Sequence, residues 1–424
     1  MLVFKFGGAS VKDAEAVKNV SRILSLFPNQ KRLVVISAMG KTTNLMEQIV
    51  EALWKKEISS YRYLVEECFN FHINILNKLF KEKHYAVHHE VETIFETLRN
   101  KIENPISDNY DFEYDQIVSL GEVLSTLIVD AFLREEGHLS VWADARKLIR
   151  TDHQYRDGNV EWDKTQQLIE ERLLPLYKKV NCVITQGFIG HTSEGFTTTL
   201  GREGSDYSAG ILAYCTDAES VTIWKDVPGM LNADPKWFEN TVKLDQISFK
   251  EAIELSYYGA SVIHPKTIKP LQNKQIPLYV KSFIHPDEPG TVIQSSMDYD
   301  HLVPSFIFKM EQVLFSITPK DFSFIAEDNL REVFDLLAKS NVKINLMQNS
   351  ALSFSFVVDQ QKVDIEKVLQ LFSARYEVKF NQDLELITIR HYDEKTIAML
   401  TESKDVLLEQ KTRQTVRLLA KHVS

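Results

Sequence analysis

The chain has 424 residues, of which 44% are hydrophobic and 25% are charged, a soluble globular composition too long for one ordinary core. We therefore expect two or three domains. The net charge of −10 argues against non-specific nucleic-acid binding, which needs an excess of Lys and Arg. The three cysteines are few and widely spaced, and neither a signal peptide nor a membrane-spanning run is visible, so we expect a cytoplasmic protein without membrane contact.

The first 300 residues have an α/β pattern. An apolar strand at 1–6 runs into Gly7-Gly8, helical spacing follows at 11–26, and a second strand follows at 32–37, which indicates a parallel βαβ opening. Long amphipathic helices are predicted at 45–57, 60–82 and 85–103, with mostly helical spacing to about residue 139. The rhythm then resumes with strands at 140–143, 180–184, 220–224, 277–281 and 291–294 and helices at 162–173, 205–215 and 249–258.

The character of the chain changes near residue 300, because all 15 glycines lie at or before Gly290. Beyond this point we predict strands at 312–317, 343–348, 352–358, 376–380, 384–390 and 405–410, and helices near 328–340, 365–374 and 393–401. This βαββαβ order is typical of a ferredoxin-like unit. We predict one domain at 1–298 and a second region at 303–424, with one full unit at about 310–383 and a truncated part at 384–424.

The segment from Lys5 to Ser10 places a Gly-Gly turn directly after a buried strand. Such a turn presents successive backbone N–H groups at a helix start, which is a geometry that attracts phosphate. Lys5 would add a positive charge near a phosphoryl group in transfer. The alternative is a tight strand–helix turn with a lysine that reaches solvent.

A second glycine-rich segment runs from 185 to 208 and contains Arg202 between two glycines. An arginine there could bind a carboxylate through both guanidinium nitrogens. Ser205 and Asp206 follow at a predicted helix start, where either side chain could cap the helix. A hairpin followed by a capped helix is the alternative, although capping does not explain the arginine.

Further polar groups lie at the ends of other elements. Glu122 opens an apolar helix, where its charge either favours the helix N-terminus or faces an ammonium group. The turn-rich stretch 224–236 follows a strand, where ligands of parallel sheets bind, and a purely structural turn is the alternative. The histidines at 72, 84, 88 and 89 lack metal-ligand spacing, and we expect them on a solvated helix face.

Taken together, these segments resemble aspartate kinases of the amino-acid kinase family. The matching stretches occur in the family's order: KFGGAS at 5–10, SAMGKTTNL at 37–45, SLGE at 119–122, TQGFIG at 185–190, TTTLGREGSDYSA at 197–209, WKDVPG at 224–229, YYGASVIHP at 257–265 and PGTVI at 289–293. Each stretch alone is weakly specific, but eight in order are highly specific.

The resemblance implies a three-layer αβα catalytic domain at 1–298 that transfers the γ-phosphoryl group of ATP to the side-chain carboxylate of L-aspartate. The product, 4-phospho-L-aspartate, is the first intermediate towards lysine, threonine and methionine, and Mg²⁺ would travel on the ATP phosphates. The implied catalytic residues are Lys5 and Asp206, the implied substrate-binding residues are Ser37, Thr43, Glu122, Arg202 and Ser205, and the implied nucleotide-binding residues are Lys5, Gly7, Gly8, Lys225, Asp226, Leu231, Lys236 and Ser261. Glu122 would face the substrate's ammonium group and Arg202 a carboxylate.

The chain departs from the family pattern at several positions. Ala9 replaces a threonine, and Glu203 stands where the family often has glycine. Leu231 stands in place of a tyrosine that contacts the nucleotide, Lys236 replaces an arginine, and Ser261 occupies a position that is lysine in some members. The contacts to adenine and ribose are therefore less well defined than those to phosphate and aspartate.

Residues 303–424 resemble ACT regulatory domains, which implies an amino-acid effector and a homodimer that forms through this region. Asn345 and Ala351 replace acidic residues that accompany lysine sensing in some members, which argues against lysine feedback. Two other functions stay open: a kinase of the same family with another acceptor, and a non-catalytic amino-acid sensor.

Overall fold

The computed structural model describes residues 1–81, 85–260 and 263–422. The chain divides into two units. The larger comprises Met1–Met230, Lys243–Ser256 and Ser261–Tyr299, and the smaller comprises Leu231–Val242, Tyr257–Ala260 and Asp300–Ser424. Each unit has its own sheet, so the two are described separately.

An eight-stranded sheet forms the centre of the larger unit, in the order β10-β12-β11-β7-β1-β2-β4-β3. The central strands β7, β1, β2 and β4 and the edge strand β3 are parallel, and β12 runs antiparallel to β11. The strands are β1 Leu2–Phe6, β2 Arg32–Ile36, β3 Ser140–Ala143, β4 Cys182–Gln186, β7 Ser220–Lys225, β10 Gln246–Ser248, β11 Leu278–Ser282 and β12 Thr291–Gln294. Two short sheets accompany it, formed by β5 Ile189–His191 with β6 Thr197–Thr199 and by β8 Met230–Leu231 with β9 Lys243–Leu244.

Helices cover both faces of this sheet, which confirms the predicted three-layer αβα architecture. Side chains alternate along each strand, so Phe4 and Phe6 join the core beneath α1 and α6, whereas Lys5 points to the opposite face. The opposite layer contains α8 and α10, which pack side by side. The helices are α1 Ala14–Ser25, α2 Thr42–Trp54, α3 Ile58–Leu79, α4 Tyr85–Lys101, α5 Tyr110–Val118, α6 Leu120–Glu135, α7 Trp162–Leu168, α8 Gly204–Cys215, α9 Phe249–Tyr258 and α10 Pro265–Lys274.

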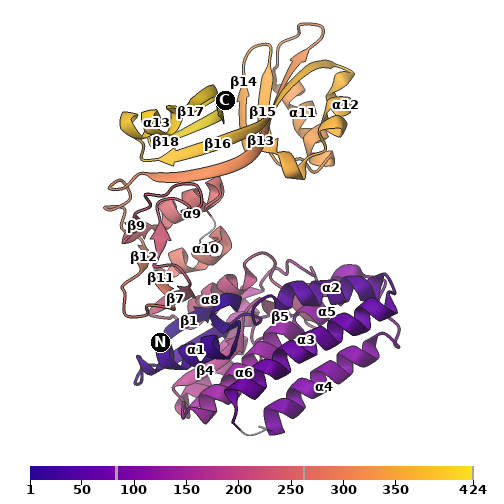
Figure 1. The fold of residues 1–424 in the computed structure, drawn as a ribbon, viewed down its shortest axis with the longest axis vertical. Helices are drawn as coiled ribbons and strands as arrows, with labels where there is room; N and C mark the ends of the chain where they lie inside the picture. The colour runs from indigo at the N-terminus through magenta and orange to yellow at the C-terminus, as the bar shows by residue number, and fades with distance from the viewer. Residues whose placement is uncertain (82–84, 261–262, 423–424) are drawn as a thin grey trace. The chain divides into compact units, whose positions relative to one another are not determined.

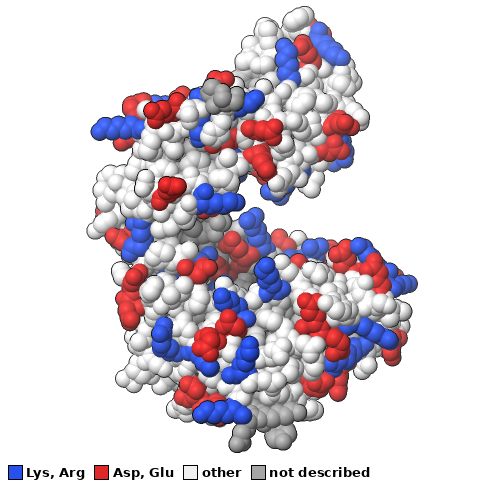
Figure 2. Space-filling view, in the orientation of Figure 1, with Lys and Arg blue, Asp and Glu red and all other residues white. Residues whose placement is uncertain are grey.

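The helices α3, α4 and α6 lie side by side in an outer bundle (Figure 1). The stretch Tyr110–Glu135 is long and apolar enough to cross a membrane by length and composition, but 83% of its most apolar window is buried inside the protein. Such extensive burial is typical of a helix in the core of a protein. On the face of the larger unit seen in Figure 2, acidic and basic side chains lie interspersed.

The smaller unit has a six-stranded sheet in the order β14-β15-β13-β16-β18-β17. Its strands are β13 Ser305–Pro319, β14 Leu346–Asn349, β15 Phe354–Asp359, β16 Tyr376–Arg390, β17 Lys404–Lys411 and β18 Thr415–His422, and its helices are α11 Glu327–Lys339, α12 Ile365–Ser373 and α13 Glu394–Thr401. The two 15-residue strands β13 and β16 pair with each other along their length, with a register shift between Lys309 and Leu314.

That register shift divides the sheet into two halves. Glu311 on β13 and Asp383 on β16 both have a left-handed backbone, with φ of 53° and 55°, and lie where the pairing is irregular. One half packs against α11 and α12 around Phe315 and Phe356, and the other packs with α13 around Ile387. The second half takes a strand from residues 305–309, ahead of the first half in the chain.

Several sequence predictions were wrong in detail. The strands predicted at 376–380 and 384–390 are the single strand β16, and β13 begins at Ser305 instead of residue 312. The strand β18 and the helix α10 were not predicted at all. Two prolines and three lysines in ten residues weaken the apolar pattern of α10, and Pro265 occupies a position that starts a helix without loss of a hydrogen bond.

Candidate functional site

The carboxyl ends of four parallel strands lie in register at one edge of the large sheet. Phe6, at the end of β1, is paired with Ile36 on β2 and with Trp224 on β7, and Ile36 is paired with Gln186 on β4. The loops that leave these strands therefore start side by side. Ligands of open parallel sheets bind at this edge.

The first of these loops carries Gly7 and Gly8. The backbone N–H of Ser10 donates to the Gly7 carbonyl over 2.9 Å and forms a short 3₁₀ turn from Gly8 to Val11. A Cβ at Gly8 would lie 2.7 Å from the carbonyl oxygen of Gly40 and 2.9 Å from that of Ala38. Only glycine permits this approach of the loop after β1 to the loop after β2.

Lys5 and Asp206 meet at this edge. Lys5 Nζ lies 2.5 Å from Asp206 Oδ1, and both side chains are buried. Asp206 is in the first turn of α8, which packs on the face of the sheet towards which Lys5 points. A Cβ at Gly7 would lie 3.3 Å from Lys5 Nζ, so the absent side chain leaves space directly beside the ammonium group.

Arg202 and Ser205 flank the start of α8. Arg202 is exposed, and no hydrogen bond or ion pair holds it to any described residue. Ser205 is half-buried and lies against the end of β4, where a Cβ on Gly187 would come 2.6 Å from Ser205 Cβ. Glu203 occupies the N-cap position of α8 with φ of 53°, a left-handed conformation that glycine adopts with less strain, and its side chain makes no capping hydrogen bond. Its Oε2 atom is buried and has no hydrogen-bond partner among the described residues. The prediction that Ser205 or Asp206 caps this helix was wrong, because both residues lie inside its first turn.

Glu122 is in the first turn of α6 and is only 2% exposed. The Ala38 N–H donates to Oε1 over 3.4 Å, while Oε2 has no hydrogen-bond partner in the part of the chain that the structure describes. Burial raises the pKa of this carboxyl from 4.5 to about 8, against the opposing effects of the Ala38 N–H and the Lys5 charge. An ammonium group that reached Oε2 would satisfy it and favour its ionised form.

Ser37 and Thr43 frame the loop after β2. The Ser37 N–H donates to the Phe6 carbonyl over 3.0 Å, which continues the pairing of β1 and β2 by one residue. Thr43 is the second residue of α2, and both side chains are half-buried. The structure therefore brings together at one edge the loops that carry Lys5, Ser37 and Asp206.

The predicted nucleotide contacts are divided between the two units. Lys225 ends β7, and its carbonyl accepts a hydrogen bond from the Phe283 N–H, while the adjacent Asp226 is exposed. Leu231 and Lys236 belong to the smaller unit. Lys236 is exposed, and its Nζ lies 4.6 Å from the ring centroid of Trp237. Ser261 lies outside the described residues.

Within the described ranges, no group of three or more His, Cys, Asp or Glu side chains could hold a metal ion. The expectation that the histidines lie on a solvated face was wrong for His72 and His88, which are buried; His84 lies outside the described residues. His72 Nδ1 lies 2.7 Å from the Cys68 carbonyl oxygen, and burial lowers its pKa to about 4. It is a core histidine, and the neighbouring apolar rings, not metal-ligand spacing, explain its position.

Two contributors to this edge were not predicted as functional residues. Ala38 supplies the backbone N–H that orients Glu122, and Gly187 permits the end of β4 to approach α8. The stretch around Ala38 had been noted as a match to the family, and Gly187 lies in the glycine-rich segment 185–208, but neither residue had been assigned a role. This edge thus has a buried lysine, a glycine-lined backbone turn, a carboxyl oxygen without a hydrogen-bond partner among the described residues, and an arginine without an ion pair to any of them. Such a set suits the binding of two anions, one of which also carries an ammonium group.

The model of the "Amino acid kinase family" matches residues 1–282 of the chain. The lysine-sensitive aspartokinase 3 of Escherichia coli K12 is 32% identical over 396 residues, which cover 92% of this chain and 86% of that protein. Aspartokinase 3 of Arabidopsis thaliana, a chloroplast protein, is 29% identical over 380 residues, which cover 87% of this chain and 66% of that protein.

Solved structures give the same grouping. E. coli aspartokinase III in complex with lysine and aspartate, in the T-state, superposes with a TM-score of 0.81 at 28% identity, covering 99% of this chain and 95% of that chain. The complex of that enzyme with aspartate and ADP, in the R-state, has a TM-score of 0.79, covering 99% and 96% of the two chains at 28% identity. A Clostridium acetobutylicum aspartate kinase at 22% identity has a TM-score of 0.82, covers 99% and 96% of the two chains, and supports the fold alone.

Proposed function

Because the chain belongs to the amino acid kinase family and, within it, to the aspartokinases, we propose that it transfers the γ-phosphoryl group of ATP to the side-chain carboxylate of L-aspartate and forms 4-phospho-L-aspartate. This reaction would be the first step towards lysine, threonine and methionine. The observation that carries the proposal is the buried ion pair of Lys5 with Asp206 beside the Gly7-Gly8 turn, at the edge where the strand ends meet.

The reaction needs no strong general base. The acceptor carboxylate is already ionised at neutral pH, so the difficulty is to bring it close to the anionic phosphates. Lys5 and the backbone N–H groups at Gly7 and Gly8 offset this repulsion. Their stabilising interaction is strongest in the transition state, where charge shifts between the reacting groups. Asp206 acts as a positioning residue, because its carboxylate holds the Lys5 ammonium beside the open space at Gly7.

Recognition of aspartate rests on two charged side chains and three hydroxyl groups in this proposal. Glu122 accepts from the substrate's ammonium group, for which its unsatisfied Oε2 is available. Arg202, which is exposed and free of an ion pair with any described residue, binds the α-carboxylate through both guanidinium nitrogens. Ser37, Thr43 and Ser205 contribute hydroxyl groups around the same substrate.

For the nucleotide, Lys225 ends β7 and Asp226 follows it at the same sheet edge, and Leu231, Lys236 and Ser261 complete the predicted set. Mg²⁺ would be held by the ATP phosphates, since no described cluster of acidic side chains and histidines forms a metal cage. The bound ion would neutralise phosphate charge during transfer. Residues 1–298 form the catalytic domain in this proposal.

Residues 303–424 serve as an ACT-type regulatory region in this proposal, and they bind an amino-acid effector and form a homodimer. Lysine is the first effector to test, since the E. coli relative is named lysine-sensitive and its structure was solved with lysine. We also propose a cytoplasmic location, in keeping with three cysteines that are free and buried.

A coupled assay of ADP release tests the function. We expect turnover with ATP, Mg²⁺ and L-aspartate, and none with L-glutamate, UMP or carbamate in place of aspartate. Turnover with one of the other acceptors alone would identify a kinase of the same family with a different substrate. No turnover with any acceptor, together with no ATP binding in a calorimeter, would favour a non-catalytic sensor.

A further inference from the structure

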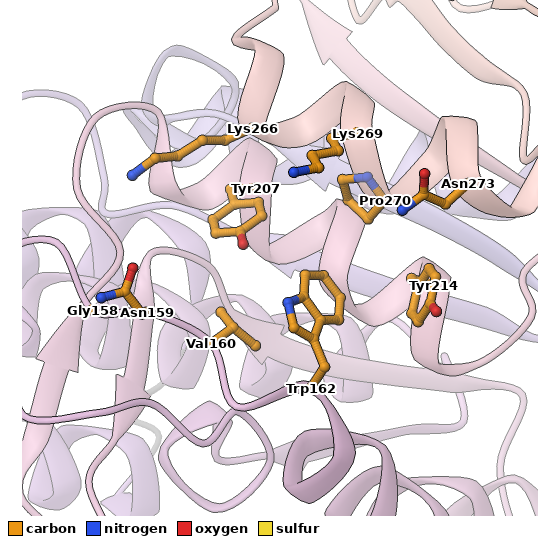
Figure 3. Close-up of a pocket in the computed structure, with 10 residues that line it drawn as sticks. All are labelled: Gly158, Asn159, Val160, Trp162, Tyr207, Tyr214, Lys266, Lys269, Pro270 and Asn273. Atoms are coloured by element: carbon orange, nitrogen blue, oxygen red, sulfur yellow. The ribbon is translucent and has the colours of Figure 1, made fainter.

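A pocket separate from the strand-end site lies between α7, α8 and α10 in the larger unit, and we call it the α7–α8–α10 pocket. It has a volume of about 410 Å³, within the range of small-molecule sites. None of its lining residues belongs to the predicted aspartate or nucleotide contacts. Figure 3 shows that Tyr207, Trp162 and Tyr214 are arranged around one space, with Lys269 and Pro270 on its far side.

The pocket is aromatic on one side. Trp162 opens α7, and Tyr207 and Tyr214 lie two turns apart on α8. The rings of Trp162 and Tyr214 meet edge to face with centroids 5.1 Å apart, yet all three aromatic side chains are only half-buried. Rings that served solely to join the helices would be covered by neighbouring side chains. The Lys274 ammonium lies over the Tyr214 ring, 4.3 Å from its centroid, so the rings of Trp162 and Tyr207 are the ones that offer a stacking surface for a planar group.

The charged side chains that line the pocket are both cationic. Lys266 and Lys269 come from the first half of α10 and no acidic residue lines the pocket, although the chain as a whole has a net charge of −10. Lys269 is exposed and has no ion-pair partner among the described residues. Lys266 pairs with Asp157, which lies outside the lining. An anion in the pocket could therefore pair with Lys269, which has no ion-pair partner among the described residues, and with Lys266, which also pairs with Asp157.

We propose that the α7–α8–α10 pocket binds a small molecule in which a planar ring carries one anionic group. The ring stacks between Trp162 and Tyr207, and the anion pairs with Lys269 and Lys266. An aryl phosphate and an aryl carboxylate share this chemistry, and the two are distinguished by experiment. An uncharged ring would contact only the aromatic side chains, and an anion without a ring would contact only the lysines, so each should bind more weakly.

The position of the pocket relates it to the strand-end site. The loop that contains Asp157 packs against the residues ahead of Arg202, because a Cβ on Gly201 would lie 2.4 Å from Asp157 Oδ1. The same loop is anchored by Asp115, which accepts from the Arg156 N–H over 3.0 Å and from the Thr199 N–H over 2.9 Å. A ligand that draws Lys266 away from Asp157 would thus act on the segment that leads to Arg202.

Binding is tested by calorimetry on the full chain with phenyl phosphate, benzoate, inorganic phosphate and phenol. We expect saturable binding of phenyl phosphate, benzoate or both, and weak or no binding of inorganic phosphate and phenol. Whichever of phenyl phosphate and benzoate binds more tightly shows whether the pocket prefers a phosphate or a carboxylate. Absence of saturable binding of both aryl anions at about 10 mM would overturn the proposal, since even a millimolar site would be filled at that concentration.

Variants locate the site. Lys269→Glu is expected to weaken binding about tenfold or more, because it replaces an attractive charge by a repulsive one. The matched control Lys164→Glu alters an exposed lysine of α7 outside the lining, and Arg202→Lys alters the proposed aspartate site. Both are expected to bind as the parent does, so the outcome does not depend on the aspartate kinase reaction.

Fluorescence adds a position-specific readout, because the ligand should quench Trp162, one of five tryptophans in the chain. Trp162→Phe should remove most of that quenching. Undiminished affinity in Lys269→Glu, or full quenching in Trp162→Phe, would place the ligand elsewhere and contradict the proposal.

Discussion

Lys5 and Asp206 form a buried ion pair, with Nζ and Oδ1 2.5 Å apart and side chains only 10% and 5% exposed. The two residues come from β1 and from the first turn of α8, some 200 positions apart in the chain. In the proposed reaction, Asp206 holds the lysine in place, and the lysine offsets the charge of the transferring phosphoryl group. Variants of this pair can therefore separate the contribution of Lys5 to stability from its contribution to catalysis.

Removal of Lys5 should affect stability and catalysis by different routes. Lys5→Met leaves Asp206 as an uncompensated buried charge, which should lower the free energy of unfolding by about 3 kcal/mol. It should also lower kcat by about 10²–10³, the scale for the loss of one transition-state charge contact. Urea denaturation and steady-state kinetics measure the two effects.

The double variant Lys5→Met/Asp206→Asn is the control for the pair. It removes both charges, so it should recover much of the lost stability while kcat stays low. If activity recovered together with stability, the role of Lys5 would be structural.

From the raised pKa of the Glu122 carboxyl group we expect ionisation to lower stability and to strengthen substrate binding. Since burial raises its pKa from 4.5 to about 8, the stability associated with its protonated form is full below about pH 4.5 and is lost as the pH rises through about 8. Glu122→Gln keeps a neutral group at all pH values, so its Tm should exceed that of the parent increasingly between about pH 5 and pH 9. Thermal unfolding across this range provides the measurement, with the exposed Glu136→Gln as a control that should show no such trend.

The same residue should make aspartate binding depend on pH. Only the ionised carboxylate pairs with an ammonium group, so KM for aspartate in the parent should fall as the pH rises from about 7 to about 9. Glu122→Gln should raise KM about tenfold or more and abolish this dependence. A pH profile of KM that is unchanged in the variant would rule out Glu122 as the ammonium contact.

Arg202 should matter for binding and not for folding. It is exposed and has no ion pair with any described residue, so Arg202→Lys should leave Tm unchanged. Because an ammonium group cannot form the paired hydrogen bonds of a guanidinium group, KM for aspartate should rise about tenfold while KM for ATP stays constant. The exposed Arg22→Lys serves as a control, and an equal rise in both KM values would indicate a general distortion of the site.

Glu203 should limit both stability and aspartate affinity. Its φ of 53° is strained for a residue with a Cβ, and its carboxylate adds negative charge beside Arg202. Glu203→Gly should raise the free energy of unfolding by up to about 1 kcal/mol and lower KM for aspartate. Gln275→Gly, at a φ of 56° after α10, should give a similar stability change without an effect on KM, and a higher KM in Glu203→Gly would reveal a binding role for the carboxylate.

Local patterns were sufficient to predict the parallel α/β fold, whereas the full set of site residues came from the resemblance to aspartate kinases and stays a prediction. A strand followed by two glycines and a glycine-rich stretch before a helix start can each be recognised within ten residues, which is why Lys5 and Asp206 were both proposed as site residues. Their direct contact could not be predicted, because it depends on the strand order β7-β1-β2-β4 and on the face of the sheet that α8 covers. These are properties of tertiary packing.

Other differences arise from tertiary contacts or from local irregularities of the backbone. The burial of His72 depends on α4, whose Phe95 packs against the histidine ring, and a polar-looking helical stretch does not reveal such a neighbour. The strand β16 was predicted as two strands, and only the second part of β13 was predicted, because Glu311 and Asp383 interrupt the alternating pattern where the backbone becomes left-handed. The α7–α8–α10 pocket unites residues from three separated segments, so no single motif could indicate it.

The most direct test of the central claim is to trap the acyl phosphate with hydroxylamine while ADP is measured. With ATP, Mg²⁺ and L-aspartate, the proposal predicts equal amounts of ADP and of the β-hydroxamate of aspartate, and almost none of either from Lys5→Met. ADP release without hydroxamate, or hydroxamate on the α-carboxylate, would contradict phosphoryl transfer to the side chain of aspartate.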